Sequence, residues 1–256
     1  RSSSTAMPTD RQEFLDVGFD VLPAEALVSR IAAVGADSPY AYLVTPNVDH
    51  LVRLHRKGFE VPQLSEIYRD ADFCVCDSKV LARLAKWRGV ELPVIPGSDL
   101  TEILFDKIIA TGDRVAIVGG DPDMVGQLRA KYPKIEFAQH LSPMGLLRNA
   151  AARREAAEFI AATKPRFTFI CVGAPQQELI AAEAAKLAGS TGLALCVGAA
   201  LDFLTDRQKR APMVFRRFGL EWAHRLLSNP RRLWRRYLVE GPAIFVLAYR
   251  WRRSAA

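Results

Sequence analysis

Short apolar runs alternate with longer amphipathic stretches through most of this 256-residue chain, and this alternation constrains the fold most strongly. Runs rich in β-branched and aromatic residues predict strands at Phe14–Val21, Ala41–Thr45, Phe73–Cys76, Arg114–Val118, Ile135–Gln139, Phe167–Val172 and Leu193–Val197. Helical patterns follow most of them, at Pro23–Val34, Val48–Lys57, Lys79–Arg88, Asp99–Thr111, Pro122–Tyr132, Ala150–Thr163 and Gln176–Ala188. Strands and helices that alternate at this spacing predict an α/β fold with a mostly parallel sheet and helices on both faces.

Changes in composition divide the chain into three parts. Residues 1–13 are polar and are expected to be disordered or to belong to an expression tag, with Met7 as a candidate natural start. Residues 14–206 carry the alternation and form the predicted α/β domain. Residues 207–256 form a basic appendage that contains thirteen Lys or Arg residues against two acids, whereas the whole chain has a net charge of +7.

The appendage interleaves its arginines with Trp and Tyr side chains. Asn229 and Pro230 suit the N-cap and first position of a helix, in which Arg232, Arg235 and Arg236 are neighbours. Such a helix suits a lipid headgroup boundary or a diphosphate, since Arg binds diphosphate in a bidentate manner. A solvated basic face is the ordinary alternative, and nucleic-acid binding is a competing one.

Several classes of protein are disfavoured by the sequence. The four cysteines lie in apolar stretches, form no C-x-x-C pair and have no zinc-like spacing with the four histidines, so no metal or cofactor site is predicted. There is no secretory signal, and no apolar run reaches the roughly 20 residues that span a bilayer. The sequence therefore predicts a cytoplasmic protein with at most peripheral contact with the inner face of the cell membrane.

Polar residues follow five of the predicted strands, in the segments Thr45–Asn47, Cys76–Ser78, Val118–Asp121, Val172–Glu178 and Val197–Asp202. Because ligands of parallel sheets bind beyond the carboxyl ends of the strands, we expect these segments to converge on one crevice.

Each of these segments also has a simpler interpretation. Gly119, Gly120 and Asp121 suit a phosphate at a helix start, but a tight turn needs glycine in any case. Asp77 suits a general base, or else an N-cap for the next helix. Thr45 and Asn47 suit a sugar hydroxyl, or a turn. The Gln177 amide suits a uracil or sugar edge, whereas a Glu such as Glu178 is favoured near any helix N-terminus.

Taken together and in order, these segments resemble the WecG/TagA/CpsF glycosyltransferases, glycosyltransferase family 26. The resemblance runs from about Asp16 to Leu238 and includes TPNVDH, PGSDL, IVGGDPD, VGAPQQE and VGAALDF. Its most specific part is the tail, with Arg210-Ala211-Pro212, Glu221-Trp222, Arg225-Leu226, Pro230 and Arg232–Leu238.

The resemblance implies a Rossmann-like catalytic domain with a basic helical appendage. It further implies an inverting, metal-independent transfer of a sugar from a UDP-sugar to a polyprenyl-diphosphate-linked acceptor, in exopolysaccharide or cell-surface polysaccharide synthesis. By motif position the catalytic base falls on Asp77, the sugar- and acceptor-contacting residues on Thr45 and Asn47, and the active-site glutamine on Gln177. Other candidate substrate-binding residues are Gly119, Gly120, Asp121, Gly173, Glu178, Gly198, Asp202, Arg210, Arg225, Arg232 and Arg235.

The chain departs from the family pattern in four places. Ser78 stands where many members have Gly, Gln176 where Lys is usual, and Thr205-Asp206 where Ala-Gly is common. Val94 stands where an Arg is common, three residues before Gly97, so the donor or acceptor specificity is expected to differ.

Two other functions fit parts of the sequence. A nucleotide-cofactor oxidoreductase fits the fold, but the chain has no G-x-G-x-x-G fingerprint. A nucleic-acid-binding module fits the basic tail but leaves the polar strand ends unexplained. The expected partners are therefore a UDP-sugar, a lipid-diphosphate-linked glycan and an anionic membrane surface, without nucleic acid, in a possible homo-oligomer.

Overall fold

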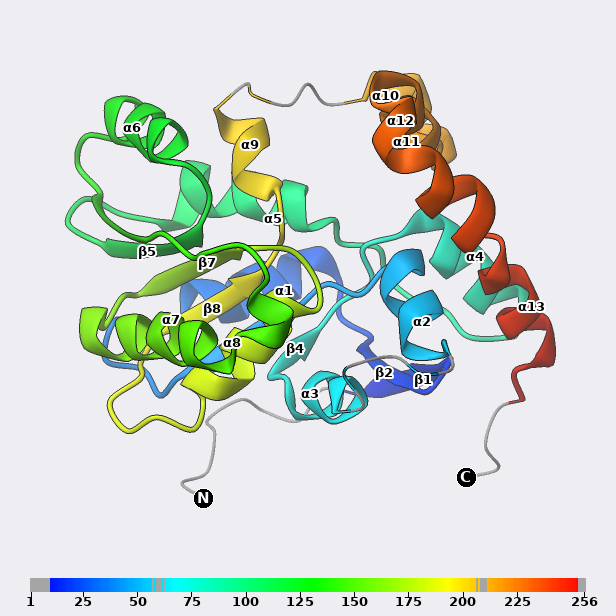
Figure 1. Cartoon of the computed structure of the whole chain (residues 1–256), viewed down its shortest axis with the longest axis horizontal. Coiled ribbons are helices and arrows are strands. Elements are labelled where there is room, and N and C mark those ends of the chain that lie inside the picture. The colour runs from blue at the N-terminus through cyan, green and yellow to red at the C-terminus, as the bar shows by residue number, and fades with distance from the viewer. Residues whose placement is uncertain are drawn as a thin grey trace.

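The computed structural model describes residues 10–252 except 57, 59–60, 62, 206 and 208–210, without the side chains of Arg216 and Arg232. Its centre is a six-stranded, wholly parallel sheet in the order β4-β3-β8-β7-β5-β6 (Figure 1). The strands are β3 (Ala41–Val44), β4 (Phe73–Cys74), β5 (Arg114–Gly119), β6 (Glu136–His140), β7 (Phe167–Cys171) and β8 (Leu193–Cys196). The predicted α/β, Rossmann-like class is confirmed.

Both faces of this sheet are buried because the central strands are apolar at nearly every position. In β7, Phe167 and Phe169 belong to one core cluster and Ile170 to the other. In β8, Leu193 and Leu195 belong to the cluster of Phe167, whereas Ala194 and Cys196 belong to the cluster of Ile170. This alternation follows from the two-residue period of a strand and explains why the runs carry no polar face.

Helices cover both sides of the sheet (Figure 1). They are α1 (Ala24–Ala32), α2 (Val48–Leu54), α3 (Leu64–Asp70), α4 (Lys79–Trp87), α5 (Gly97–Ile103) with its π-helical continuation η1 (Leu104–Ile108), α6 (Pro122–Lys131), η2 (Leu146–Arg148), α7 (Ala150–Thr163), α8 (Gln176–Ala184) and α9 (Ala200–Leu204). Seven of these confirm predicted helical patterns. The sequence reasoning missed α3, a short helix that contributes Leu64 and Tyr68 to the core.

The N-terminal strand prediction was wrong in form. The segment predicted as one strand from Phe14 is a hairpin, β1 (Arg11–Phe14) and β2 (Val17–Asp20), paired antiparallel outside the main sheet. Leu15 and Asp16 form the turn with φ of 51° and 60°, as two-residue hairpin turns require. The turn consists of a buried Leu and an Asp, so the sequence lacks the Asn-Gly pair that is typical of such turns. Among the residues that the structure describes, the first strand starts at Arg11.

The appendage lies beside α2 and α4, along the right side of Figure 1. Its helices are α10 (Met213–Phe218), α11 (Glu221–Ser228), α12 (Pro230–Trp234), the π-helical η3 (Arg235–Glu240) and α13 (Ala243–Arg250). Arg83 of α4 donates to the Phe218 carbonyl at 2.8 Å, and Trp251 packs edge-on against Phe14 with ring centroids 5.1 Å apart. In the part of the chain that the structure describes, every helix is too short or too polar to cross a membrane.

Candidate active site

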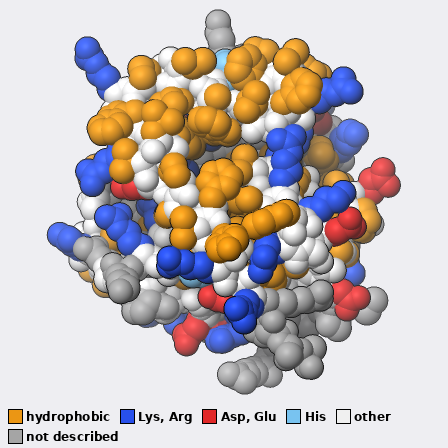
Figure 2. Space-filling view, turned by 90° about the vertical axis from the view of Figure 1, so that its right-hand side faces the viewer, with side chains coloured by type: hydrophobic (Ala, Val, Ile, Leu, Met, Phe, Trp, Pro, Cys, Tyr) orange, Lys and Arg blue, Asp and Glu red, His pale blue; other side chains and the backbone are white. Residues whose placement is uncertain are grey.

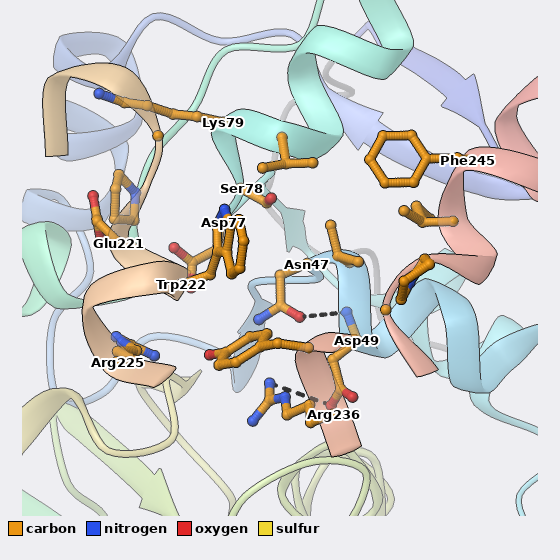
Figure 3. Close-up of a pocket in the computed structure, with 18 of the residues that line it drawn as sticks. Asn47, Asp49, Asp77, Ser78, Lys79, Glu221, Trp222, Arg225, Arg236 and Phe245 are labelled. Carbon is orange, nitrogen blue, oxygen red and sulfur yellow. Dashed lines mark hydrogen bonds and ion pairs between the residues drawn. The ribbon is translucent and has the colours of Figure 1, made fainter. Parts of the chain in front are cut away.

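A cavity of about 400 Å³ lies between the α/β domain and the appendage. Its walls come from the segments after β3 and β4 on one side and from α11, η3 and α13 on the other, as Figure 3 shows for the labelled residues. The side chains that line it include Asn47, Asp49, Asp77, Lys79, Glu221, Trp222, Arg225, Arg236, Tyr237, Leu238, Ile244 and Phe245. Of the site residues that the sequence predicted, this cavity brings together Asn47, Asp77 and Arg225.

Asp77 lies at the carboxyl end of the β4 segment and points into the cavity (Figure 3). It does not cap the following helix, because the hydroxyl of Ser78 takes that position and accepts from the Leu81 N–H at 3.2 Å. Burial raises the pKa of Asp77 to about 7, and the nearby Glu221 and Asp99 add to this effect. The Arg225 guanidinium and a hydrogen bond from the Gly97 backbone oppose the rise in pKa.

Asn47 and Thr45 have structural roles at the end of β3. Asn47 caps α2, with its Oδ1 accepting from the Asp49 N–H at 3.0 Å, and still lines the cavity. Thr45 is buried, does not line the cavity, and donates its hydroxyl to the Cys196 carbonyl at 3.0 Å. The hydroxyl of Thr45 therefore ties the end of β3 to β8, whereas Asn47 combines a cap with exposure to the cavity.

The amide of Gln177 is buried within the protein rather than directed into the cavity. Its oxygen accepts from the Gly198 N–H at 3.0 Å, and its nitrogen donates to Glu178 at 2.9 Å and to the Cys196 carbonyl at 3.3 Å. Gln177 thus ties the start of α8 to the end of β8. The segment VGAPQQE supports the sheet edge and contributes no residue to the cavity lining.

Glu178 and His50 form a buried pair behind Asn47. The His50 Nδ1 accepts from the Asn47 N–H at 3.1 Å, and its Nε2 lies 3.7 Å from the Glu178 carboxylate. Burial raises the pKa of Glu178 to about 7 and lowers the pKa of His50 to about 4. His50 is therefore neutral at pH 7 and accepts at Nδ1, while one Glu178 oxygen has no hydrogen-bond partner.

We expect Glu178→Gln to stabilise the protein at alkaline pH. Because the pKa of this carboxyl is higher in the folded than in the unfolded state, its ionisation destabilises the protein as pH rises from about 4.5 towards 7. The destabilisation remains above pH 7. The glutamine has no charge and keeps an acceptor for Gln177. Denaturant unfolding should give no gain at pH 4 and a gain of about 1–3 kcal/mol at pH 8.5. An equal gain at both pH values would contradict this explanation.

The glycine turns lie farther along the sheet edge, beyond β5, β7 and β8, and none of them lines the cavity. Gly119 and Gly120 have φ of 85° and 69°, and Gly173 and Gly198 also have positive φ. Asp121 caps α6, with its carboxylate accepting from the Met124 N–H at 2.9 Å, and pairs with Arg207. Burial raises the pKa of the half-buried Asp202. The predicted single crevice is therefore divided between the cavity and these turns.

Only one predicted appendage arginine among the described side chains faces the cavity. Arg225 does so and also lies over the Phe203 ring at 5.6 Å. Arg235 is 70% exposed and pairs with Glu240 at 3.4 Å. Arg210 and the Arg232 side chain lie outside the described residues.

Arg236, which was not among the predicted site residues, lines the cavity instead of Arg235. It pairs with Asp49 at 3.3 Å, and its buried Nε has no hydrogen-bond partner. Trp222 and Tyr237 were also missed; their rings lie 6.1 Å apart in the cavity wall. These positions share the cavity because α11 and η3 dock against the α/β domain, which no local spacing of residues encodes.

In the described ranges of the chain, no three His, Cys, Asp or Glu side chains are grouped as metal ligands. The cationic side chains that line the cavity together with Asp77 are those of Lys79, Arg225 and Arg236.

The sequence profile of the glycosyl transferase WecG/TagA/CpsF family matches residues 12–256. An N-acetylglucosaminyldiphosphoundecaprenol N-acetyl-beta-D-mannosaminyltransferase from Bacillus spizizenii is 32% identical over 206 residues, which cover 77% of this chain and 75% of the relative. The profile match includes both the domain and the appendage, and hence both walls of the cavity.

Proposed function

The chain belongs to the WecG/TagA/CpsF family of glycosyltransferases, and from this premise we propose that it transfers a sugar from a UDP-sugar to a polyprenyl-diphosphate-linked glycan. The relative's name describes an N-acetylglucosaminyl diphosphoundecaprenol acceptor and a transferred N-acetylmannosaminyl group. We extend that class of acceptor to this protein, and a UDP-linked N-acetylhexosamine is the proposed donor. Its product would serve the synthesis of exopolysaccharide or another cell-surface polysaccharide.

The observation that carries this proposal is the placement of Asp77. Its carboxyl group points into a cavity that the basic appendage closes, and its pKa lies near neutrality, where a general base is most effective. Asp77 would take the proton from an acceptor hydroxyl while that oxygen attacks the anomeric carbon. The bond between this carbon and the diphosphate of the donor would break, and UDP would leave with the electron pair. A single displacement of this kind inverts the anomeric configuration.

The cavity wall suits both parts of a sugar diphosphate. Trp222 and Tyr237 offer aromatic faces to a sugar ring, and Asn47 offers an amide. Arg225 and Arg236 supply positive charge for diphosphate oxygens, which Arg binds in a bidentate manner. The family pattern has an Arg at the position of Val94, and Val94 lines the cavity. Arg236 lines the same cavity and is our candidate for the positive charge that Val94 lacks. The glycine turns beyond β5 and β7 remain the proposed contacts of the donor nucleotide.

The outer surface of the appendage fits a membrane. Exposed large apolar side chains occur along it at Met213, Val214, Phe218, Leu220, Leu227, Trp234, Leu238, Val239, Phe245, Val246 and Tyr249. Figure 2 shows hydrophobic side chains gathered on this face, with Lys and Arg around and between them. Apolar area together with positive charge binds anionic bilayers at the interface, so we propose a peripheral position on the inner face of the cell membrane.

The direct test is an assay of UDP release. Purified protein would be given UDP-N-acetylhexosamines together with N-acetylglucosaminyl diphosphate prenyl acceptors, and the product would be identified by mass spectrometry. The proposal requires acceptor-dependent UDP release and a product that is one sugar larger. Hydrolysis of the donor without any acceptor product would contradict it. No observation on the described residues favours either the oxidoreductase or the nucleic-acid-binding alternative.

We expect the rate to depend on pH through Asp77. A general base must be ionised, so kcat/KM should rise with pH and level off above about 7. Glu221→Gln removes a neighbouring negative charge and should move this limb to lower pH, whereas Arg225→Ala should move it to higher pH. The measurement is kcat/KM between pH 5 and 9. Shifts in the same direction for both variants would exclude Asp77 as the titrating group.

A further inference from the structure

One end of the cavity differs chemically from the end that holds Asp77. The Asp77 end contains Glu221, Trp222 and Arg225 (Figure 3). Where α13 packs on α2 and α4, and η3 on α2, the lining side chains include apolar ones from each element: Val48 of α2, Val80 of α4, Leu238 of η3, and Pro242, Ile244 and Phe245 at the N-cap and start of α13. Figure 3 places Phe245 on the opposite side of Asn47 from Arg225. A sugar diphosphate would leave this apolar end unused.

The apolar end has a closed floor and an open rim. Ile244 is 1% exposed and forms the floor, whereas Leu238 and Phe245 are each 56% exposed at the rim. Beyond the rim, Val239, Val246 and Tyr249 are exposed and carry the apolar surface away from the cavity. An apolar path therefore leads from the cavity that holds Asp77 to the outside of the appendage.

We infer that this end of the cavity is a binding site for the first isoprene units of the lipid acceptor. The inference rests on the proposed function and adds to it that the enzyme recognises the hydrocarbon chain itself as well as the sugar and the diphosphate. The choice of ligand follows from the adjacency of the two kinds of surface. An apolar chain joined to a diphosphate needs apolar walls directly beside cationic side chains, and Arg236 lies in the same cavity as Leu238 and Phe245. A cavity of about 400 Å³ holds the head of such a lipid and only the start of its chain.

The test uses soluble acceptors, so that no membrane is needed. N-acetylglucosaminyl diphosphate would be esterified to methyl, geranyl or farnesyl groups and assayed without detergent or vesicles. Each apolar methylene that leaves water contributes about fourfold in affinity, so kcat/KM for the geranyl ester should exceed that for the methyl ester by about tenfold or more.

Matched variants locate the effect. Phe245→Ala and Leu238→Ala should abolish most of the preference for geranyl over methyl while leaving turnover of the methyl ester within about twofold. Tyr249→Ala removes an aromatic side chain from the same helix, 71% exposed and outside the cavity lining, and should keep the preference. A preference that persists in both cavity variants, or equal turnover of the two esters by the wild type, would overturn the inference.

Three further outcomes distinguish a prenyl site from a failed acceptor assay and from a bilayer contact. If the methyl ester is consumed without any prenyl preference, the proposed function stands and the prenyl site is wrong. If no acceptor is consumed, binding of geranyl diphosphate is measured by isothermal titration calorimetry, and unchanged affinity in Phe245→Ala overturns the site on its own. If Phe245→Ala weakens only the binding of anionic vesicles, this residue contacts the bilayer rather than the acceptor, and the prenyl site is wrong.

Discussion

Asp77→Asn should lower kcat by about 10²–10⁴-fold without unfolding the protein. The substitution keeps the size of the side chain but removes the carboxylate that we propose as the general base. Because the helix cap is provided by Ser78 and not by Asp77, the local backbone should be unaffected. The variant should be more stable than the wild type at pH 8, where the carboxyl with a raised pKa is ionised at a cost to the folded state.

Glu221→Gln is the control for this variant. Glu221 lines the same cavity as Asp77, and its negative charge raises the pKa of Asp77. If Asp77 is the base, Glu221→Gln keeps most of the activity at pH 8. Full activity in Asp77→Asn together with a large loss in Glu221→Gln would transfer the role of base to Glu221. Steady-state rates at saturating donor, with circular dichroism as a folding check, decide between the two.

The second large effect concerns the arginines of the appendage. We expect Arg225→Ala and Arg236→Ala each to lower kcat/KM for the acceptor by about 10–100-fold, since a hydrogen bond to a charged group contributes about 1.5–3 kcal/mol. Arg235→Ala is the matched control, because it removes the same charge from the position next to Arg236 but from an exposed side chain. It should change kcat/KM by less than about twofold, in keeping with the small contribution of surface ion pairs.

A purely structural role for Arg236 can be separated from ligand binding. Arg236 pairs with Asp49, and this contact also joins η3 to α2. Asp49→Asn breaks the ion pair but leaves the guanidinium in place. If Arg236 binds diphosphate, Asp49→Asn should preserve or improve the KM for the acceptor. If the ion pair is all that matters, Asp49→Asn should be as damaging as Arg236→Ala. Loss of activity in Arg235→Ala but not in Arg236→Ala would contradict the assignment.

Some parts of the site could be located from the sequence and others could not. Asp77 was placed correctly at a strand end because fully apolar strands have recognisable ends, and parallel strands direct those ends to one edge. The choice between base and cap was not accessible, since Asp77 and Ser78 are adjacent and both residue types cap helices. Gln177 shows the opposite case: the motif is present, but its amide is used by Gly198, Cys196 and Glu178.

The sequence by itself determined the class of the fold, the parallel sheet buried on both faces, and the basic character of the tail, because periodicity and charge are local properties of the chain. Only the tertiary structure decided which side chains share a cavity. Arg236 enters it and the neighbouring Arg235 does not, and Trp251 fixes the end of the appendage by packing on Phe14, near the opposite end of the sequence. Contacts of this kind depend on how separate elements dock, and no local pattern encodes them.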